Sequence, residues 1–196
     1  MYVCCHCSLP ATCWGIRMRL DLACTRCPLS RSRTQVVPPD GDLDSIVCFV
    51  GEAPGEKEDL TGKPFVGRAG KMLDKLLRIE ELGRERIMIT NTVKCRPPEN
   101  RNPTAEEMTA CFPYLEQELE GRKLVVAMGR VACADLIGDV TKLGNEANVV
   151  RKVKVGRDQI DVLPAYHPSA CLFNVQARKS LQESIRIAKG FIDDDR

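Results

Sequence analysis

Short apolar runs alternate with amphipathic segments along most of this chain, and this alternation limits the folds that it can adopt. The run 46–50, Ile-Val-Cys-Phe-Val, is apolar at every position, as expected for a strand buried on both faces. Segments 87–93 and 123–128 have the same strand-like character, and apolar residues recur at helical spacing over 69–79. Strands that alternate with helices predict a parallel sheet with helices on both faces. The expected fold class is therefore α/β.

The second half of the chain contributes further elements. Thr104, with Glu107 three residues later, has the pattern of a capping box and predicts the start of a helix. Segments 149–155 and 159–163 are strand-like and flank a Gly-Arg-Asp turn, which predicts a hairpin. The chain closes with an amphipathic pattern over 176–192, which predicts a final helix.

Polar segments follow three of the predicted strands. The segment 51–55 reads Gly-Glu-Ala-Pro-Gly, Asn91 ends a strand, and Tyr166-His167 follows the hairpin. Ligands of parallel sheets bind beyond the carboxyl ends of the strands, so these segments predict a site at one edge. Pro168 restricts His167 to an extended backbone, and the amide of Asn91 suits the edge of a nucleobase. A structural role is the alternative for a single histidine.

The glycine-containing loops do not match the common nucleotide-binding motifs. The segment 51–55 is not a P-loop, because no Gly-Lys-Ser/Thr follows it, and it is not a GxGxxG pattern. A plain strand-ending turn is the alternative. The loop 62–67 reads Gly-Lys-Pro-Phe-Val-Gly, and an aromatic ring in such a polar loop is awkward to bury as core. We therefore expect Phe65 to serve as a stacking platform for a flat ring.

Two pairs of cysteines are candidates for a metal centre. Cys24-x-x-Cys27 has a spacing that lets both thiolates reach one metal. Cys95 and Cys111 flank a proline-rich loop and the start of a helix, an arrangement compatible with zinc or with an iron–sulfur cluster. Spacing alone does not choose between the two. Cys111 lies on the apolar face of its helix, so a plain core cysteine is the alternative there.

Composition excludes some classes of protein. The chain of 196 residues has 11 cysteines but no pattern of a secretory signal, and no stretch approaches the roughly 20 apolar residues of a membrane span. Reduced thiols and metal ligands are therefore expected rather than disulfides, in an intracellular protein without a membrane partner. The net charge of +2 does not by itself indicate nucleic acid. Basic residues beside the Gly/Pro-rich loops are Lys63, Arg68, Lys71, Lys94, Arg96, Arg101, Arg178 and Lys179, although scattered solubilising charges are an equal alternative.

The first 19 residues differ from the rest. They contain five potential metal ligands, Cys4, Cys5, His6, Cys7 and Cys13, enough for a second metal site. A poorly ordered extension over 1–19 is the favoured interpretation, with Met18 as an alternative start of the protein. The main domain is expected over 20–196.

Five motifs, taken together and in order, resemble those of the family-4 uracil-DNA glycosylases. They are Cys-x-x-Cys-Pro at 24–28, Gly-Glu-Ala-Pro-Gly at 51–55, Gly-Lys-Pro-Phe-Val-Gly-Arg-Ala-Gly at 62–70, Ile-Thr-Asn-x-Val-Lys-Cys-Arg-Pro-Pro at 89–98 and His-Pro-Ser at 167–169. Each motif is modestly specific, whereas five in order are highly specific, and the resemblance runs from about Leu20 to the last helix. It implies a three-layer α/β/α sandwich with a central, mostly parallel sheet.

The resemblance also implies an activity and a cofactor. Such an enzyme is a monofunctional DNA glycosylase that hydrolyses the N-glycosidic bond of uracil, releases free uracil and leaves an abasic site, which initiates base excision repair. Its partner would be uracil-containing DNA, single- or double-stranded, and a monomer is expected. A 4Fe-4S cluster would be held by Cys24, Cys27, Cys95 and Cys111. The uracil-binding residues would be Ala53, Glu58, Phe65, Asn91 and His167.

The same resemblance implies individual roles for these side chains. Phe65 would stack on the flipped uracil, and Asn91 would bind the polar edge that distinguishes uracil from cytosine. His167 would donate to the O2 side of the ring. Glu52 would help to place or polarise the attacking water, and with His167 it completes the expected catalytic pair. Glu58 would crowd the C5 position and so discourage thymine.

Two alternatives bear on this expectation. One branch of the superfamily links a loop histidine covalently to the abasic sugar, but no matching insertion follows Arg96, so turnover is expected. A non-enzymatic nucleic-acid-binding module with a structural zinc on the four cysteines is the second alternative. That module would explain the thiols and the basic loops, but not three candidate base-binding residues at strand ends.

Overall fold

The structure is a computed structural model that describes residues 20–138 and 142–195. The expectation for 1–19 therefore lies outside the described residues, and the expected domain over 20–196 stays a prediction. The described part contains a six-stranded sheet with the strand order β1-β3-β2-β4-β6-β5. The strands are β1 (Asp40–Gly41), β2 (Val47–Gly51), β3 (Met88–Asn91), β4 (Leu124–Met128), β5 (Arg151–Val155) and β6 (Asp158–Ala165).

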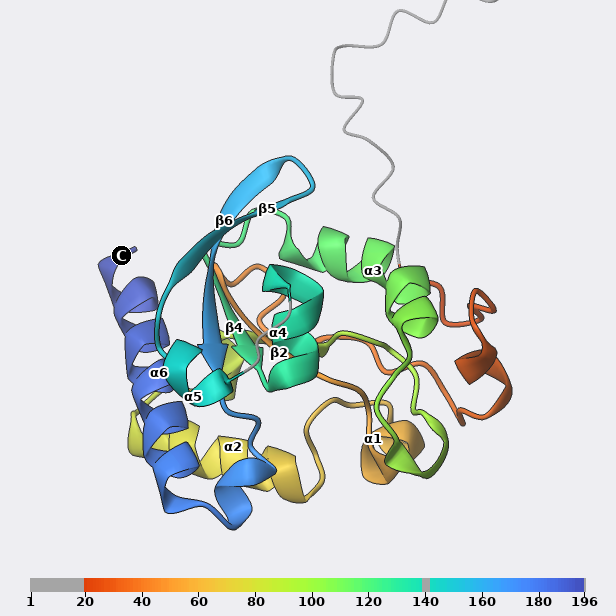
Figure 1. Cartoon of the computed structure of the whole chain (residues 1–196), viewed down its shortest axis with the longest axis horizontal. Helices are drawn as coiled ribbons and strands as arrows, with labels where there is room; N and C mark the ends of the chain where they lie inside the picture. Colours follow the sequence, from red (N-terminus) through yellow and green to blue (C-terminus); the bar gives the residue numbers. More distant parts are fainter. Residues whose placement is uncertain (1–19, 139–141, 196) are drawn as a thin grey trace, which may run out of the picture.

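The four central strands are parallel, as the alternation of strands and helices predicts. The strand β2 pairs with β3 and β4, and β4 pairs with β6, all in parallel. The two edge strands, β1 and β5, run antiparallel to their neighbours. The pair β5–β6 is the hairpin expected from the sequence, and it extends beyond the helices (Figure 1). The sheet is therefore mostly parallel.

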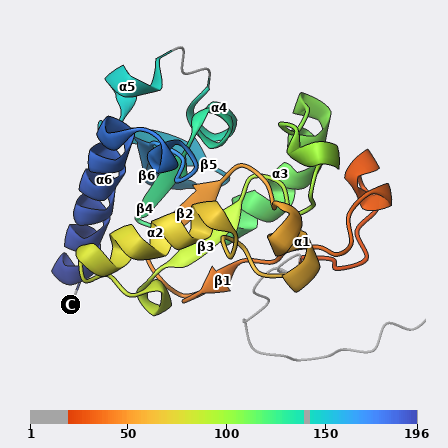
Figure 2. The ribbon, with the colours of Figure 1, turned by 90° about the horizontal axis from the view of Figure 1, so that it is seen from below.

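Helices cover both faces of the sheet, as Figures 1 and 2 show. One apolar core joins the sheet to α2 and α6, and a second core joins the opposite face to α3 and α4. The three-layer α/β/α expectation is thus confirmed. The helices are α1 (Glu56–Thr61), α2 (Arg68–Ile79), α3 (Ala105–Leu119), α4 (Arg130–Ile137), α5 (Leu143–Glu146) and α6 (Val175–Asp194), with short 3-10 turns η1 (Pro28–Arg31), η2 (Arg84–Arg86), η3 (Pro98–Asn100) and η4 (Ala170–Leu172). Among the described helices, none is long and apolar enough to cross a membrane.

The helix α3 begins where the sequence predicts it. The capping box of α3 is present, because the Glu107 N–H donates to Thr104 Oγ1 at 3.3 Å and the Thr104 N–H donates to Glu107 Oε2 at 2.8 Å. Arg101 adds two hydrogen bonds to the same carboxylate, which lower the pKa of Glu107. The start of α3 is thereby tied to the loop that precedes it.

A third, smaller core forms around the N-terminal segment of the described chain. The segment 20–37 lies at one side of the sheet, near α1 and α3 (Figures 1 and 2). Its Leu29 and Val36 pack with Val93, which follows β3, and with Tyr114 of α3. This cysteine lobe, defined as residues 20–37 with the chain after β3 and the part of α3 that they contact, adjoins the strand-end edge of the sheet.

Candidate active site

A cavity of about 570 Å³ opens at the carboxyl ends of the central strands. Its size is in the usual range for small-molecule sites. It is lined by the loops that follow β2, β3, β4 and β6, the edge at which ligands of parallel sheets bind. The sequence-predicted site residues that line it are Glu52, Ala53, Glu58, Phe65, Asn91 and His167. The structure therefore brings together all of the residues predicted to bind or attack the base.

Asn91 ends β3 with an unsatisfied polar atom. Its side chain is only 3% exposed, and its Oδ1 has no hydrogen-bond partner among the described residues. A buried acceptor without a partner costs about 1–3 kcal/mol, so such an atom in a cavity indicates the position of a ligand donor. Gly51 leaves room for it, because a Cβ there would lie 2.6 Å from this Oδ1 and 2.4 Å from Phe65 Cζ.

Phe65 is in the cavity wall, but the reasoning that predicted its exposure was wrong. The ring is only 5% exposed and belongs to the core that joins the sheet to α2 and α6. The loop folds back on α2 so closely that a Cβ at Gly70 would lie 1.7 Å from the Phe65 carbonyl oxygen. One side of the ring thus packs as core while the residue still lines the cavity, with its centroid 5.8 Å from that of His167 at an interplanar angle of 39°.

His167 is held as a neutral ring with a defined tautomer. Burial lowers its pKa to about 4, although the negative charge of Glu58 opposes this shift. The backbone N–H of Ser169 donates to Nδ1 at 3.2 Å, and Oγ of Ser169 lies 2.8 Å from the same nitrogen. A backbone N–H can only donate, so Nδ1 accepts and the ring proton is on Nε2. His167 therefore offers the cavity a neutral N–H donor.

Two carboxylates line the cavity in different ways. Burial raises the pKa of Glu52, and the positive charge of Arg130 opposes this rise. The Glu52 backbone carbonyl accepts from the Val93 N–H at 3.2 Å, which joins β2 to the chain after β3.

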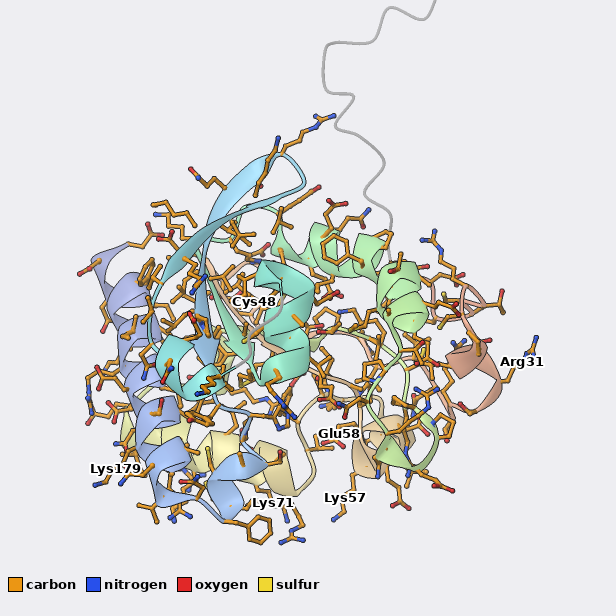
Figure 3. The ribbon with its side chains drawn as sticks, in the orientation of Figure 1. Arg31, Cys48, Lys57, Glu58, Lys71 and Lys179 are labelled. Carbon is orange, nitrogen blue, oxygen red and sulfur yellow. The ribbon has the colours of Figure 1, made fainter. Side chains whose placement is uncertain are left out.

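Glu58 points from α1 toward the middle of the molecule, whereas the neighbouring Lys57 points outward (Figure 3). Its Oε1 accepts from the backbone N–H groups of Val66 and Gly67 at 2.9 and 2.7 Å, so Glu58 holds the Phe65 loop.

The four predicted cysteine ligands lie together in the cysteine lobe. Cys24 and Cys27 are half-buried, Cys95 and Cys111 are buried, and all four are free. Two of the sulfurs accept hydrogen bonds: Arg33 Nη1 donates to Cys95 Sγ at 3.2 Å, and the Lys94 backbone N–H donates to Cys111 Sγ at 3.4 Å.

The surroundings of these sulfurs bear on the kind of group that they could hold. Burial raises the pKa of Cys95 and raises that of Cys111 to about 11, and a bound cation would favour the thiolate form of both. Within the described ranges, no three potential ligands stand close enough together to hold a single metal ion. Ala53 connects the lobe to the site, because it packs against these cysteines and also lines the cavity.

One of the basic residues beside the loops is not available to a ligand. Lys94 is 1% exposed and forms an ion pair with Glu118 at 2.6 Å. Its Nζ also donates to the Asn91 carbonyl oxygen at 2.6 Å and to Thr90 Oγ1 at 2.8 Å. Lys94 therefore stabilises the end of β3 through these hydrogen bonds to Thr90 and Asn91. Arg68, in contrast, is exposed and lines the cavity, and Arg101 lines it while paired with Glu107.

Sequence reasoning missed several residues around the cavity. Ser169 follows the histidine by two positions and could have been recognised as its partner, since a short turn brings such residues together. Arg130 and Leu172 also line the cavity, and Phe173, next to Leu172, is 84% exposed. The pattern Cys-Leu-Phe gives no local signal for this exposure, because an apolar run of this kind usually indicates core.

Comparisons with known proteins agree with this geometry. A family model described as "Uracil DNA glycosylase superfamily" matches residues 38–188. The chain is 43% identical over 179 residues to a "Type-4 uracil-DNA glycosylase" of Thermotoga maritima, covering 86% of this chain and 89% of that protein. It is 41% identical over 175 residues to a protein of the same description from Sulfurisphaera tokodaii, covering 84% and 78%. A "Type-5 uracil-DNA glycosylase" of Pyrobaculum aerophilum is 35% identical over 153 residues, covering 68% and 65%.

Proposed function

Since the chain belongs to the uracil DNA glycosylase superfamily, we propose that it removes uracil from DNA by hydrolysing the bond between the base and deoxyribose. Free uracil and an abasic site would be the products, and the reaction would begin base excision repair. The observation that carries the proposal is the unpaired, buried Oδ1 of Asn91 in a cavity that also holds a neutral histidine donor and an aromatic ring.

Asn91 would select the base. Uracil presents an N3–H donor beside its O4 acceptor, and the carboxamide of asparagine presents the complementary acceptor and donor. Cytosine has an acceptor at N3 and a donor at position 4, so it would leave both groups of the amide unpaired. Because a buried unpaired polar group costs about 1–3 kcal/mol, one amide can discriminate strongly between the two bases.

Phe65 would receive the base after it leaves the DNA stack. Extruding a nucleotide costs a few kcal/mol, and stacking on an aromatic ring partly offsets this cost. The ring is already packed by the core on one side, so little side-chain freedom remains to be lost when a base arrives. Glu58, which lines the same cavity and holds the Phe65 loop, would leave no room for the C5 methyl group of thymine.

His167 would stabilise the leaving group. Breaking the bond from C1′ of the sugar to N1 of uracil places negative charge on the base, largely on O2. A preorganised N–H donor directed at that oxygen binds the transition state better than the ground state. Because Nδ1 accepts from Ser169, the Nε2–H is the donor, and the proton stays on Nε2 throughout.

Glu52 would act at the sugar. Glu52 lines the cavity, and its carboxylate offers an acceptor that can orient the attacking water. A carboxylate also stabilises the positive charge that develops on the sugar as the base departs. Arg130 favours the charged form of Glu52, which both roles require.

We propose that the four cysteines hold an iron–sulfur cluster. Zinc draws all of its ligand sulfurs to about 2.3 Å from a single point, whereas each cysteine of a cluster binds a different iron. The presence of four free cysteines, Cys24, Cys27, Cys95 and Cys111, in and around one small core supports the 4Fe-4S cluster implied by the family resemblance. A bound cluster would cross-link residues 20–37, the chain after β3 and α3. None of these four side chains lines the cavity, so we propose a structural role.

The substrate would be uracil-containing DNA. Arg68 and Arg130 line the cavity and are exposed, so they are candidates for phosphate contacts. Because DNA is the substrate, we place the enzyme inside the cell, and we propose that it acts as a monomer.

A non-enzymatic binding module with structural zinc is less well supported. Such a module would not explain why one cavity contains an unpaired amide and a histidine with a fixed tautomer.

The test of the proposed function is base release from a labelled oligonucleotide that contains one deoxyuridine, followed by alkaline cleavage. Wild-type protein should cleave at the uracil, and His167→Ala should lose about 10²–10³-fold in rate while it still binds uracil-containing DNA. Absence of cleavage by folded wild-type protein would contradict the proposed reaction. A near wild-type rate for His167→Ala would remove the role of that residue alone.

A further inference from the structure

The backbone of Phe65 is in an unusual conformation. Its φ is +55°, in the left-handed region that residues other than glycine rarely adopt. A residue in this region is strained and persists only when its surroundings hold it there. The loop 62–67 has no strand or helix of its own to supply that support, so the support must come from side chains around it.

One side chain, Arg84 in η2, holds the peptide groups on both sides of Phe65. Its Nη1 donates to the Phe65 carbonyl oxygen at 3.1 Å, and its Nη2 donates to the Pro64 carbonyl oxygen. The Pro64 carbonyl belongs to the peptide plane before the Phe65 Cα, and the Phe65 carbonyl belongs to the plane after it. Together the two bonds determine both backbone dihedrals of Phe65.

Arg84 is itself held in place. Its Nε donates to Asp40 at 3.3 Å, and its Nη1 also donates to Asp74 of α2 at 3.1 Å. A guanidinium presents its donors in a rigid planar fork, so two carboxylates on one part of the fork fix the direction of the rest. The side chain is 23% exposed and does not line the base-binding cavity.

A second side chain holds the same peptide plane from the opposite end. Glu58 accepts from the N–H of Val66, and this N–H shares a peptide plane with the Phe65 carbonyl that Arg84 binds. The plane is therefore fixed at both ends by charged groups on different elements, α1 and η2. Glu58 lines the cavity, so its position alone suggests a functional role. Arg84 does not line the cavity, and only its hydrogen bonds to the Phe65 loop indicate a role.

We propose that Arg84 is a positioning residue for base excision, which sets the orientation of the Phe65 ring by holding the two peptide groups that flank it. The inference rests on the proposed stacking role of Phe65. A lysine at this position has one point of attachment and cannot bind both carbonyls while it pairs with both carboxylates. Displacement of a binding group by about 1 Å can cost about 100-fold in rate, so the effect on catalysis should be measurable.

The experiment is a double-mutant cycle on the deoxyuridine oligonucleotide. Arg84→Lys should lower kcat/KM by between about tenfold and 100-fold in the wild-type background. In a Phe65→Ala background the same change should lower kcat/KM by less than about twofold, because no ring remains to be positioned. The amides of Val66 and Gly67 should also exchange hydrogen faster in Arg84→Lys, which is a readout independent of activity.

Arg86→Lys is the matched control. Arg86 is in the same 3-10 turn, is also 23% exposed and also forms an ion pair, with Asp193 at 2.7 Å, but it has no hydrogen bond to the Phe65 loop. This variant should retain wild-type kcat/KM. If Arg84→Lys unfolds at the assay temperature, Asp74→Asn replaces it in the cycle, since it removes one of the two groups that orient the guanidinium.

Failure of the inference and failure of the proposed function give different results. If Phe65→Ala retains full activity, the stacking role itself is wrong. If Phe65→Ala is impaired but Arg84→Lys lowers its activity by as much as it lowers that of the wild type, Arg84 does not act through Phe65. Wild-type kcat/KM in Arg84→Lys would overturn the inference in the same way.

Discussion

The backbone N–H of Ser169 donates to Nδ1 of His167 at 3.2 Å, so the proton of the neutral imidazole is on Nε2. The fold thus determines which ring nitrogen donates before any base arrives.

The low pKa of His167 has a consequence for stability. In the unfolded chain His167 binds a proton near pH 6.5, whereas in the folded protein it does so only near pH 4.

The first prediction concerns this pH dependence. Between pH 6.5 and 4 the unfolded state binds more protons than the folded state, so the contribution of His167 to stability is present above pH 6.5 and is lost as the pH falls. His167→Asn should therefore lose less stability than the wild type over this range. Urea unfolding at pH 7 and pH 4.5 measures the difference, and an equal loss in both proteins would contradict the assigned pKa.

The second prediction separates function from stability at Asn91. Its Oδ1 is buried without a partner in the free protein, so Asn91→Ala removes a group that does not stabilise the fold. We expect the variant to keep or exceed the wild-type melting temperature while excision falls about 10²–10³-fold. Thermal unfolding and single-turnover excision measure the two effects. A strongly destabilised variant would mean that the amide has a structural role instead.

A third prediction concerns the space between the two base-binding side chains. A Cβ at Gly51 would lie 2.4 Å from Phe65 Cζ and 2.6 Å from Asn91 Oδ1, so Gly51→Ala must displace one of them. Excision should fall by about tenfold or more. Gly190→Ala in α6 is a suitable control, because a Cβ there meets nothing within 4 Å. Equal activity of the two variants would exclude a close fit at the end of β2.

The fourth prediction concerns the buried ion pair beneath Asn91. Glu118→Ala would leave Lys94 buried without its carboxylate, which should cost about 3–5 kcal/mol of unfolding free energy. Replacing both by apolar residues of similar size, Lys94→Met with Glu118→Leu, should cost less than the single change. Lys152→Ala removes an exposed pair with Asp161 and should cost less than about 1 kcal/mol. Denaturant unfolding compares all three.

The fifth prediction concerns the four cysteines. Protein purified without oxygen should be brown and contain about four irons per chain, and Cys27→Ser should lose the colour and the iron. Cys133→Ala, which changes a buried cysteine of α4 that packs in a different core from the four proposed ligands, should retain both. Elemental analysis distinguishes the possibilities, and one zinc per chain would contradict the proposed cluster.

Much of the fold is determined by local sequence. Strands β2 and β4 were predicted from apolar runs, the start of α3 from Thr104 and Glu107, and the β5–β6 hairpin from its turn. These signals are readable because burial pattern, capping and turn chemistry depend on residues only a few positions apart. The gathering of Glu52, Asn91 and His167 at one edge follows from the same argument, since parallel strands end together.

Tertiary structure alone decided how these residues are held. The sequence suggested that Phe65 would be exposed, but the loop folds onto Gly70 and the ring enters the core. It also suggested that Lys94 was one of several basic residues beside loops. In the structure Lys94 is buried and forms an ion pair with Glu118, which is 24 positions further along the chain. Arg84 reaches the carbonyl of a residue 19 positions earlier. Such contacts join segments that are remote in sequence, and packing rather than local pattern determines which of them meet.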